Sequence, residues 1–125
     1  MRSSLSVRRK NRLKSKRDIL RFIGLAMRAG KVVSGYDASM AELKAGRGEL
    51  IIISKDISTN TLDSLMNLAE RYEGEFPGAF SFASMSELGT AIGRPDRAIL
   101  VITDKGFADK LTEMFEDYED TEEDS

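Results

Sequence analysis

Residues 24–56 read GLAMRAGKVVSGYDASMAELKAGRGELIIISKD, and this stretch decides the fold class. Its apolar and turn-forming residues predict, in order, a helix ending at Gly30, a strand at 32–33, a turn at 34–35, a helix over about 37–45, a turn at 46–48 and a strand at Leu50–Ile53. Gly30 suits the left-handed residue that follows many helices. Leu50–Ile53 is apolar at every position, which is typical of a central strand covered on both faces.

The same alternation of helices and strands continues on both sides of this stretch. The expected elements are a helix from about 18 to 30, a helix from the cap at 58–60 to about 72, a strand over 79–83, a capping-box helix from Ser84 to Ile92, a strand at Ile99–Ile102 and a last helix from Asp104. The helix after 58–60 is expected to bury Leu62, Leu65, Met66 and Ala69. This order predicts an α/β fold, a three-layer α-β-α sandwich around a small mixed four-stranded sheet.

The composition is that of one soluble globular domain. Of 125 residues, 41% are hydrophobic and 32% are charged, and there is no cysteine or histidine. That excludes disulfides, a thiol nucleophile and a histidine base. No paired carboxylates, phosphate-binding loop or metal-ligand spacing stands out, so we predict a protein that is not an enzyme and uses no cofactor or metal. Without a membrane-spanning apolar run or a secretory signal, we expect a cytoplasmic monomer.

The formal net charge of −2 hides two oppositely charged ends. Residues 2–17 hold eight basic side chains and no acid, whereas residues 113–125 hold eight acids and no base. Low hydrophobicity and high charge favour disorder in a free chain. We therefore expect a basic disordered arm at 1–15, a single α/β domain at 16–116 and an acidic disordered tail at 117–125. The charge of the basic arm suits binding to phosphate groups. The alternative interpretation is that the arm only increases solubility.

The start of the helix predicted at about 37 is the first candidate binding site. Ser34, Gly35, Tyr36 and Asp37 lie at its mouth, where backbone N–H groups and the positive end of the helix dipole bind phosphate. Lysine and arginine lie just upstream. A simple strand-to-helix turn, with Asp37 as a cap or first-turn acid, is the alternative interpretation.

Two further segments supply cations. The loop GRPDR at 93–97 follows the capping-box helix, and its Arg94 and Arg97 have guanidinium groups that stack on bases or bind phosphate. Lys55 follows the central strand, at the carboxyl end where ligands of α/β proteins gather. A solvated connection at 93–97 and a strand-end lysine without function are the alternatives.

Two blocks of sequence carry a resemblance to a known family. The first holds GLA at 24–26, RAGK at 28–31, VSG at 33–35 and ISKD at 53–56, and the second holds ELGTAIG at 87–93 and RAILVITD at 97–104. In this order and spacing, over about 18–112, the chain resembles the kink-turn RNA-binding superfamily of ribosomal proteins, in particular its short bacterial members of the large-subunit "seven-Ae" and "thirty-e" type.

The resemblance implies a non-catalytic RNA-binding protein of ribosomal-protein type, which recognises kinked or bulged RNA, ribosomal or ribosome-associated, through a helix N-terminus and adjacent loops. In archaeal relatives an Asn-Glu pair and a Lys one turn later read tandem sheared G·A pairs in the kink. The matching positions here are Asp37, Ala38 and Ala41, and none of them keeps the family's residue. The contacts that remain possible are those of the protein backbone and of cations with RNA phosphates. The RNA-binding residues expected are Arg28, Lys31, Ser34, Gly35, Tyr36, Asp37, Lys55, Arg94, Pro95 and Arg97.

A protein–protein adaptor on the same fold, ribosome-associated and without specific RNA recognition, is the alternative hypothesis. Its partners would be ribosomal proteins, and the loss of the Asn-Glu-Lys set favours it. The two hypotheses differ in where the cations fall in space, because a shared cationic face favours RNA. The cations concerned are Arg28, Lys31, Arg47, Lys55, Arg94 and Arg97.

Overall fold

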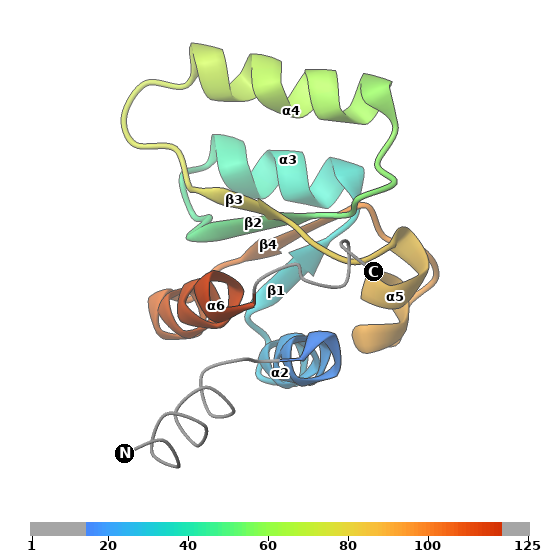
Figure 1. Ribbon diagram of the computed structural model, residues 1–125. Helices are drawn as coiled ribbons and strands as arrows, with labels where there is room; N and C mark the ends of the chain where they lie inside the picture. The colour runs from blue at the N-terminus through green and yellow to red at the C-terminus, as the bar shows by residue number, and fades with distance from the viewer. Residues whose placement is uncertain (1–14, 119–125) are drawn as a thin grey trace, which may run out of the picture.

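The computed structural model describes residues 15–118 (Figure 1). In chain order the elements are α2 (Lys16–Arg28), β1 (Val32–Ser34), α3 (Tyr36–Lys44), β2 (Leu50–Ile53), α4 (Thr59–Arg71), β3 (Ala79–Ser81), α5 (Met85–Ala91), β4 (Ile99–Ile102) and α6 (Lys105–Asp117). The predicted order is confirmed. The arm and tail predicted at 1–15 and 117–125 lie outside the described residues, apart from 15 and 117–118. Across residues 15–118, no helix combines the length and apolarity needed to cross a membrane.

The four strands form one mixed sheet in the order β1-β4-β2-β3. Strand β4 is antiparallel to both β1 and β2, and β3 is parallel to β2. Ser34 pairs with Leu100, and Ile53 pairs with Ile99. The carboxyl ends of β1 and β2 therefore meet the beginning of β4 at one end of the sheet, which we call the site end.

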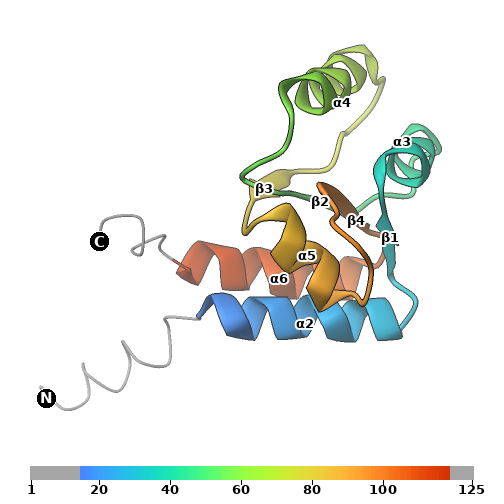
Figure 2. The ribbon, with the colours of Figure 1, turned by 90° about the vertical axis from the view of Figure 1, so that its right-hand side faces the viewer.

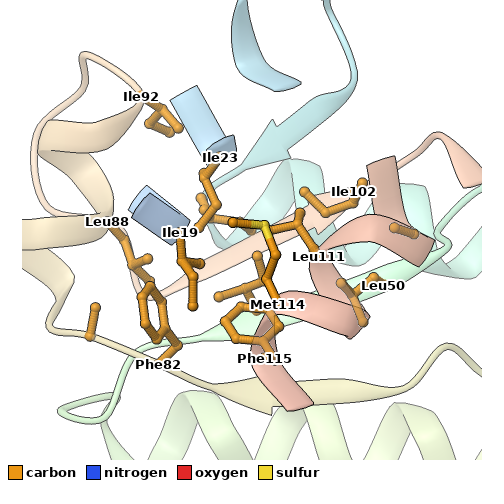
Figure 3. Close-up of a cluster of buried hydrophobic side chains, with 14 residues drawn as sticks. Ile19, Ile23, Leu50, Phe82, Leu88, Ile92, Ile102, Leu111, Met114 and Phe115 are labelled. Atoms are coloured by element: carbon orange, nitrogen blue, oxygen red, sulfur yellow. The ribbon is translucent and has the colours of Figure 1, made fainter. Parts of the chain in front are cut away.

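Helices cover both faces of the sheet, so the predicted three-layer sandwich is confirmed. Helices α3 and α4 cover one face, and α2, α5 and α6 cover the other (Figures 1 and 2). Successive strand residues alternate between the two cores, because side chains of a strand point to opposite faces. Ile52 packs with α2, α5 and α6, whereas Ile51 packs with α3 and α4. The larger core is closed by Phe82, whose ring lies 5.1 Å from that of Phe115 (Figure 3).

Side-chain caps begin all the helices of residues 15–118 except α3. The side-chain oxygens of Ser15, Ser58, Ser84 and Asp104 each accept a hydrogen bond from the backbone N–H three residues later. Each such cap stabilises a helix by about 1 kcal/mol. The residue at the N-cap of α3 is Gly35, which has no side chain to accept such a hydrogen bond.

One residue predicted to be buried on α4 is exposed. Leu65 and Leu68 are the buried residues of this helix, whereas Met66 is 55% exposed. Helix α4 lies on the outside of the sheet face that it shares with α3 (Figure 1), so only a narrow stripe of it reaches the core. Met66 lies about 100° around the helix from Leu65, which takes it off that stripe.

Candidate nucleic-acid interface

The mouth of α3 is an uncapped helix N-terminus at the site end of the sheet. Gly35 has φ 91° and ψ 163°, a backbone conformation that other residues rarely adopt. Its N–H donates to the Ile99 carbonyl oxygen at 3.1 Å, and its own carbonyl accepts from Ser39 N–H at 3.0 Å. Asp37 is a first-turn acid and makes no capping bond. Within residues 15–118, no side chain accepts from the first-turn N–H groups, so these donors are available to an anion.

Arg97 joins this helix mouth to the loop at 93–97. Its Nε donates to Ser34 Oγ at 3.1 Å, across 63 residues of sequence, and a terminal nitrogen donates to the Asp96 carbonyl oxygen at 3.1 Å. The same Nε lies 3.8 Å from the point that a Cβ on Gly35 would occupy. The guanidinium group is therefore held beside the start of α3.

The loop at 93–97 folds back along α5 and is fixed there by its backbone. Arg94 N–H donates to the Gly89 carbonyl oxygen at 2.8 Å, and Arg97 N–H donates to that of Met85 at 3.0 Å. A Cβ on Gly89 would lie 2.7 Å from the Pro95 carbonyl carbon and 2.8 Å from the Arg94 carbonyl oxygen. Glycine is thus required at 89 for the loop to reach this position, while the side chains of Arg94 and Pro95 stay exposed.

The turn after β2 brings Lys55 to the same end of the sheet. Lys55 N–H donates to the Ala83 carbonyl oxygen at 2.7 Å. The next residue, Asp56, accepts from Met85 N–H at 2.9 Å, so its carboxylate holds the first residue of α5. This hydrogen bond holds the pKa of the Asp56 carboxyl below its usual value. In the sequence, Asp56 stands out only as part of the ISKD block at 53–56, since nothing local shows that it reaches residue 85.

Two of the six cations do not join this cluster. Lys31 precedes β1, and its carbonyl accepts from Thr103 N–H at 3.0 Å, at the opposite end of the strand. Three residues of strand separate Lys31 from Ser34 by about 10 Å. Arg47 follows α3 and pairs with Glu42 at 2.9 Å, and their hydrogen bond lowers the Glu42 pKa.

The other four cations lie at the site end or beside the loop at 93–97. Lys55, Arg94 and Arg97 lie at the site end, and Arg28 lines a hollow together with Gly93, the first residue of the loop. Tyr36, the first residue of α3, is 44% exposed. Within residues 15–118, no group of histidine, cysteine, aspartate and glutamate side chains is placed to hold a metal ion. The site therefore offers N–H donors, guanidinium groups and an exposed ring.

The fold and this cationic helix mouth define a small α/β sandwich of the ribosomal-protein type. The sequence profile described as the Ribosomal protein L7Ae/L30e/S12e/Gadd45 family matches residues 17–112, and the chain belongs to this family. The family comprises non-catalytic proteins.

Individual relatives agree with this membership. The chain is 34% identical to a Bacillus subtilis protein named RNA-binding protein YlxQ, over 75% of this chain and 91% of that one. It is 29% identical to the large ribosomal subunit protein eL30 of Dictyostelium discoideum, over 81% and 89% of the two chains. A solved structure of a Bacillus halodurans protein of unknown function superposes with a TM-score of 0.70 at 26% identity, covering 78% of this chain and 96% of that one.

Proposed function

We propose that this protein binds kinked or bulged structured RNA through the N-terminus of α3 and the loop at 93–97, as a ribosome-associated cytoplasmic protein. The observation that carries the proposal is the Arg97 Nε to Ser34 Oγ hydrogen bond, which sets a guanidinium group beside an uncapped helix start. Relatives named as an RNA-binding protein and as large-subunit ribosomal proteins support RNA as the ligand.

Each group at the site has a distinct part in binding. The open N–H groups of α3 and the exposed Arg94 contact phosphate oxygens, which positions the RNA without reading its sequence. Tyr36 stacks on an unpaired base, as exposed aromatic rings do in single-stranded RNA recognition. The ionised carboxylate of Asp37 only accepts hydrogen bonds, so it pairs with amino or imino groups of bases and avoids phosphate.

The distribution of cations separates this proposal from the adaptor hypothesis. Lys31 and Arg47 lie away from the site end, as an adaptor without RNA recognition would allow. Arg97 lies beside the one uncapped helix start of residues 15–118, and Lys55 and Arg94 lie at the same end of the sheet, which favours a polyanion.

The test is RNA affinity of the full chain with Arg94→Gln and Arg97→Gln combined. The matched control is Lys44→Gln with Arg71→Gln, which removes the same charge from exposed last-turn positions of α3 and α4. The probe is an RNA duplex with a bulge beside tandem G·A pairs. Because hydrogen bonds to charged groups contribute roughly 1.5–3 kcal/mol each, the site variant should bind at least tenfold more weakly. Equal affinity of a folded site variant and the control would refute the site.

A further inference from the structure

Helices α2 and α5 lie side by side (Figure 2), and their side chains line a groove outside the site. It is bounded by Arg17, Arg21 and Arg28 on α2 and by Glu87 and Ala91 on α5, and we call it the α2–α5 groove. The two helices approach closely because residue 24 is glycine, where a Cβ would lie 2.9 Å from the Ala91 carbonyl oxygen. The proposed site uses only Arg28 of these residues.

Each end of the α2–α5 groove adjoins a hollow that includes one residue of the proposed RNA site or of its loop. At one end, Arg28 lines a hollow together with Gly93, where the loop at 93–97 begins. At the other end, Lys16 and Glu87 line a hollow together with Lys55. A chain lying in the groove would therefore reach the beginning of the loop at 93–97 at one end and Lys55 at the other.

The charge of the groove is strongly positive. Glu87 is the acid in its lining, and it is already occupied: it accepts from Ser84 N–H at 2.9 Å and pairs with Lys16 at 3.2 Å. Within residues 15–118, no carboxylate pairs with Arg17, Arg21 or Arg28. Three guanidinium groups thus remain for an external anion.

The spacing of these arginines makes a track along the helix. Positions 17, 21 and 28 fall within about 40° of one another around α2, and they span about 16 Å along its axis. That length spans several successive phosphates of a nucleic-acid strand, which are about 3.4 Å apart along the axis in double-stranded DNA. Arginine suits such a track because its planar fork binds phosphate through two hydrogen bonds.

We propose that the α2–α5 groove is a second RNA-binding surface, which takes the phosphate backbone of a stem that leaves the RNA held at the mouth of α3. This proposal rests on the proposed function and extends its footprint along α2. It assigns Arg17 and Arg21, which belong to neither the helix mouth nor the loop, a role in binding the phosphate backbone of the stem. Backbone contacts of this kind add affinity and set the direction of the stem, and they read no bases.

The test measures RNA affinity of the full chain, and asks whether the gain from a longer stem depends on the positive charge of the groove. Two probes carry the same bulge and tandem G·A pairs, one with short stems and one with a stem extended by about ten base pairs. The groove variant is Arg17→Gln with Arg21→Gln, and Lys44→Gln with Arg71→Gln is the control. For wild type and control, the long probe should bind more tightly. For the groove variant, this advantage should disappear, and the slope of log affinity against log salt should fall by about 2 for the long probe, since each phosphate contact contributes about 1.

The remaining outcomes overturn the inference in distinguishable ways. If the wild type binds both probes and the Arg94→Gln and Arg97→Gln variant weakens both, but the groove variant keeps the stem-length advantage, the groove inference fails and the proposed function stands. If the wild type binds neither probe, both fail. If poly-glutamate competes as well as the long RNA, the groove is a site for acidic peptides. Circular dichroism checks that each variant is folded; of the substituted side chains, Arg97 is half-buried and the others are exposed.

Discussion

Replacing Gly89 by alanine has two opposite effects on stability, one from helix propensity and one from steric overlap, and the structure indicates which is larger. Glycine inside a helix is about 1 kcal/mol less favourable than alanine, so propensity alone predicts that Gly89→Ala stabilises α5. The new Cβ, however, would lie 2.7 Å from the Pro95 carbonyl carbon and 2.8 Å from the Arg94 carbonyl oxygen. These are backbone atoms that no side-chain rotation can move away.

The steric effect should win. Overpacking costs about 1–3 kcal/mol, and contact with several backbone atoms places this site at the upper end, so a net loss of about 2 kcal/mol is expected. For a domain of this size that corresponds to a fall in melting temperature of roughly 10 °C. Displacing Arg94 and Pro95 also moves Arg97 away from Ser34, so RNA binding should weaken as well.

Thermal and denaturant unfolding, followed by RNA titration of the folded variant, measure both effects. Gly78→Ala is the matched control, because a Cβ there meets no atom within 4 Å and its backbone conformation is ordinary. The control should change stability by less than about 0.5 kcal/mol. A Gly89→Ala protein that is as stable as wild type, with unchanged RNA affinity, would show that the loop does not rest against α5 as described.

Three other predictions concern stability, specificity and charge. The fold lowers the pKa of Glu87, chiefly through the hydrogen bond from Ser84 N–H, so its carboxylate stabilises the native state above pH 4.5 and this contribution is lost as the pH falls through the lowered pKa. Glu87→Gln should therefore lower the melting temperature at pH 7, and this difference should shrink as the pH falls below 4.5. Restoring the family's side chains should raise the preference for kinked over straight RNA by about 1–3 kcal/mol in competition titrations, by analogy with base contacts to DNA; the substitutions are Asp37→Asn, Ala38→Glu and Ala41→Lys. No gain would show that the alignment is wrong or that the chain recognises a different ligand. Deleting residues 2–14 should weaken all RNAs alike and flatten the salt dependence, whereas superimposable salt slopes would leave the arm without a role in binding.

Local signals in the sequence were sufficient to predict the helices and strands and their order along the chain. Ser84 and Glu87 form the predicted capping box, and Gly30 adopts the predicted left-handed conformation after α2. The all-apolar strands at Leu50–Ile53 and Ile99–Ile102 are the two central strands of the sheet. Each of these features depends on residues within a few positions of one another.

The candidate site depends on contacts that local patterns do not encode. The Arg97 bond to Ser34 and the Asp56 bond to Met85 join segments 63 and 29 residues apart, and both follow from the packing of α5 against the sheet. The role of Gly89 is likewise visible only once the loop at 93–97 is in place. Met66 was assigned to the core because its spacing is helical, and the position of α4 at the outside of the sandwich leaves it exposed.

The central claim is that RNA meets the protein at the mouth of α3 and the adjoining loop. Ultraviolet crosslinking of the full chain in cells, with sequencing of the attached RNA and mass spectrometry of the attached peptides, tests it most directly. The account predicts crosslinks within 34–37 and 93–97, to kinked or bulged structured RNA of the ribosome or its assembly. Crosslinks confined to α4, or no recovered RNA above background, would contradict it.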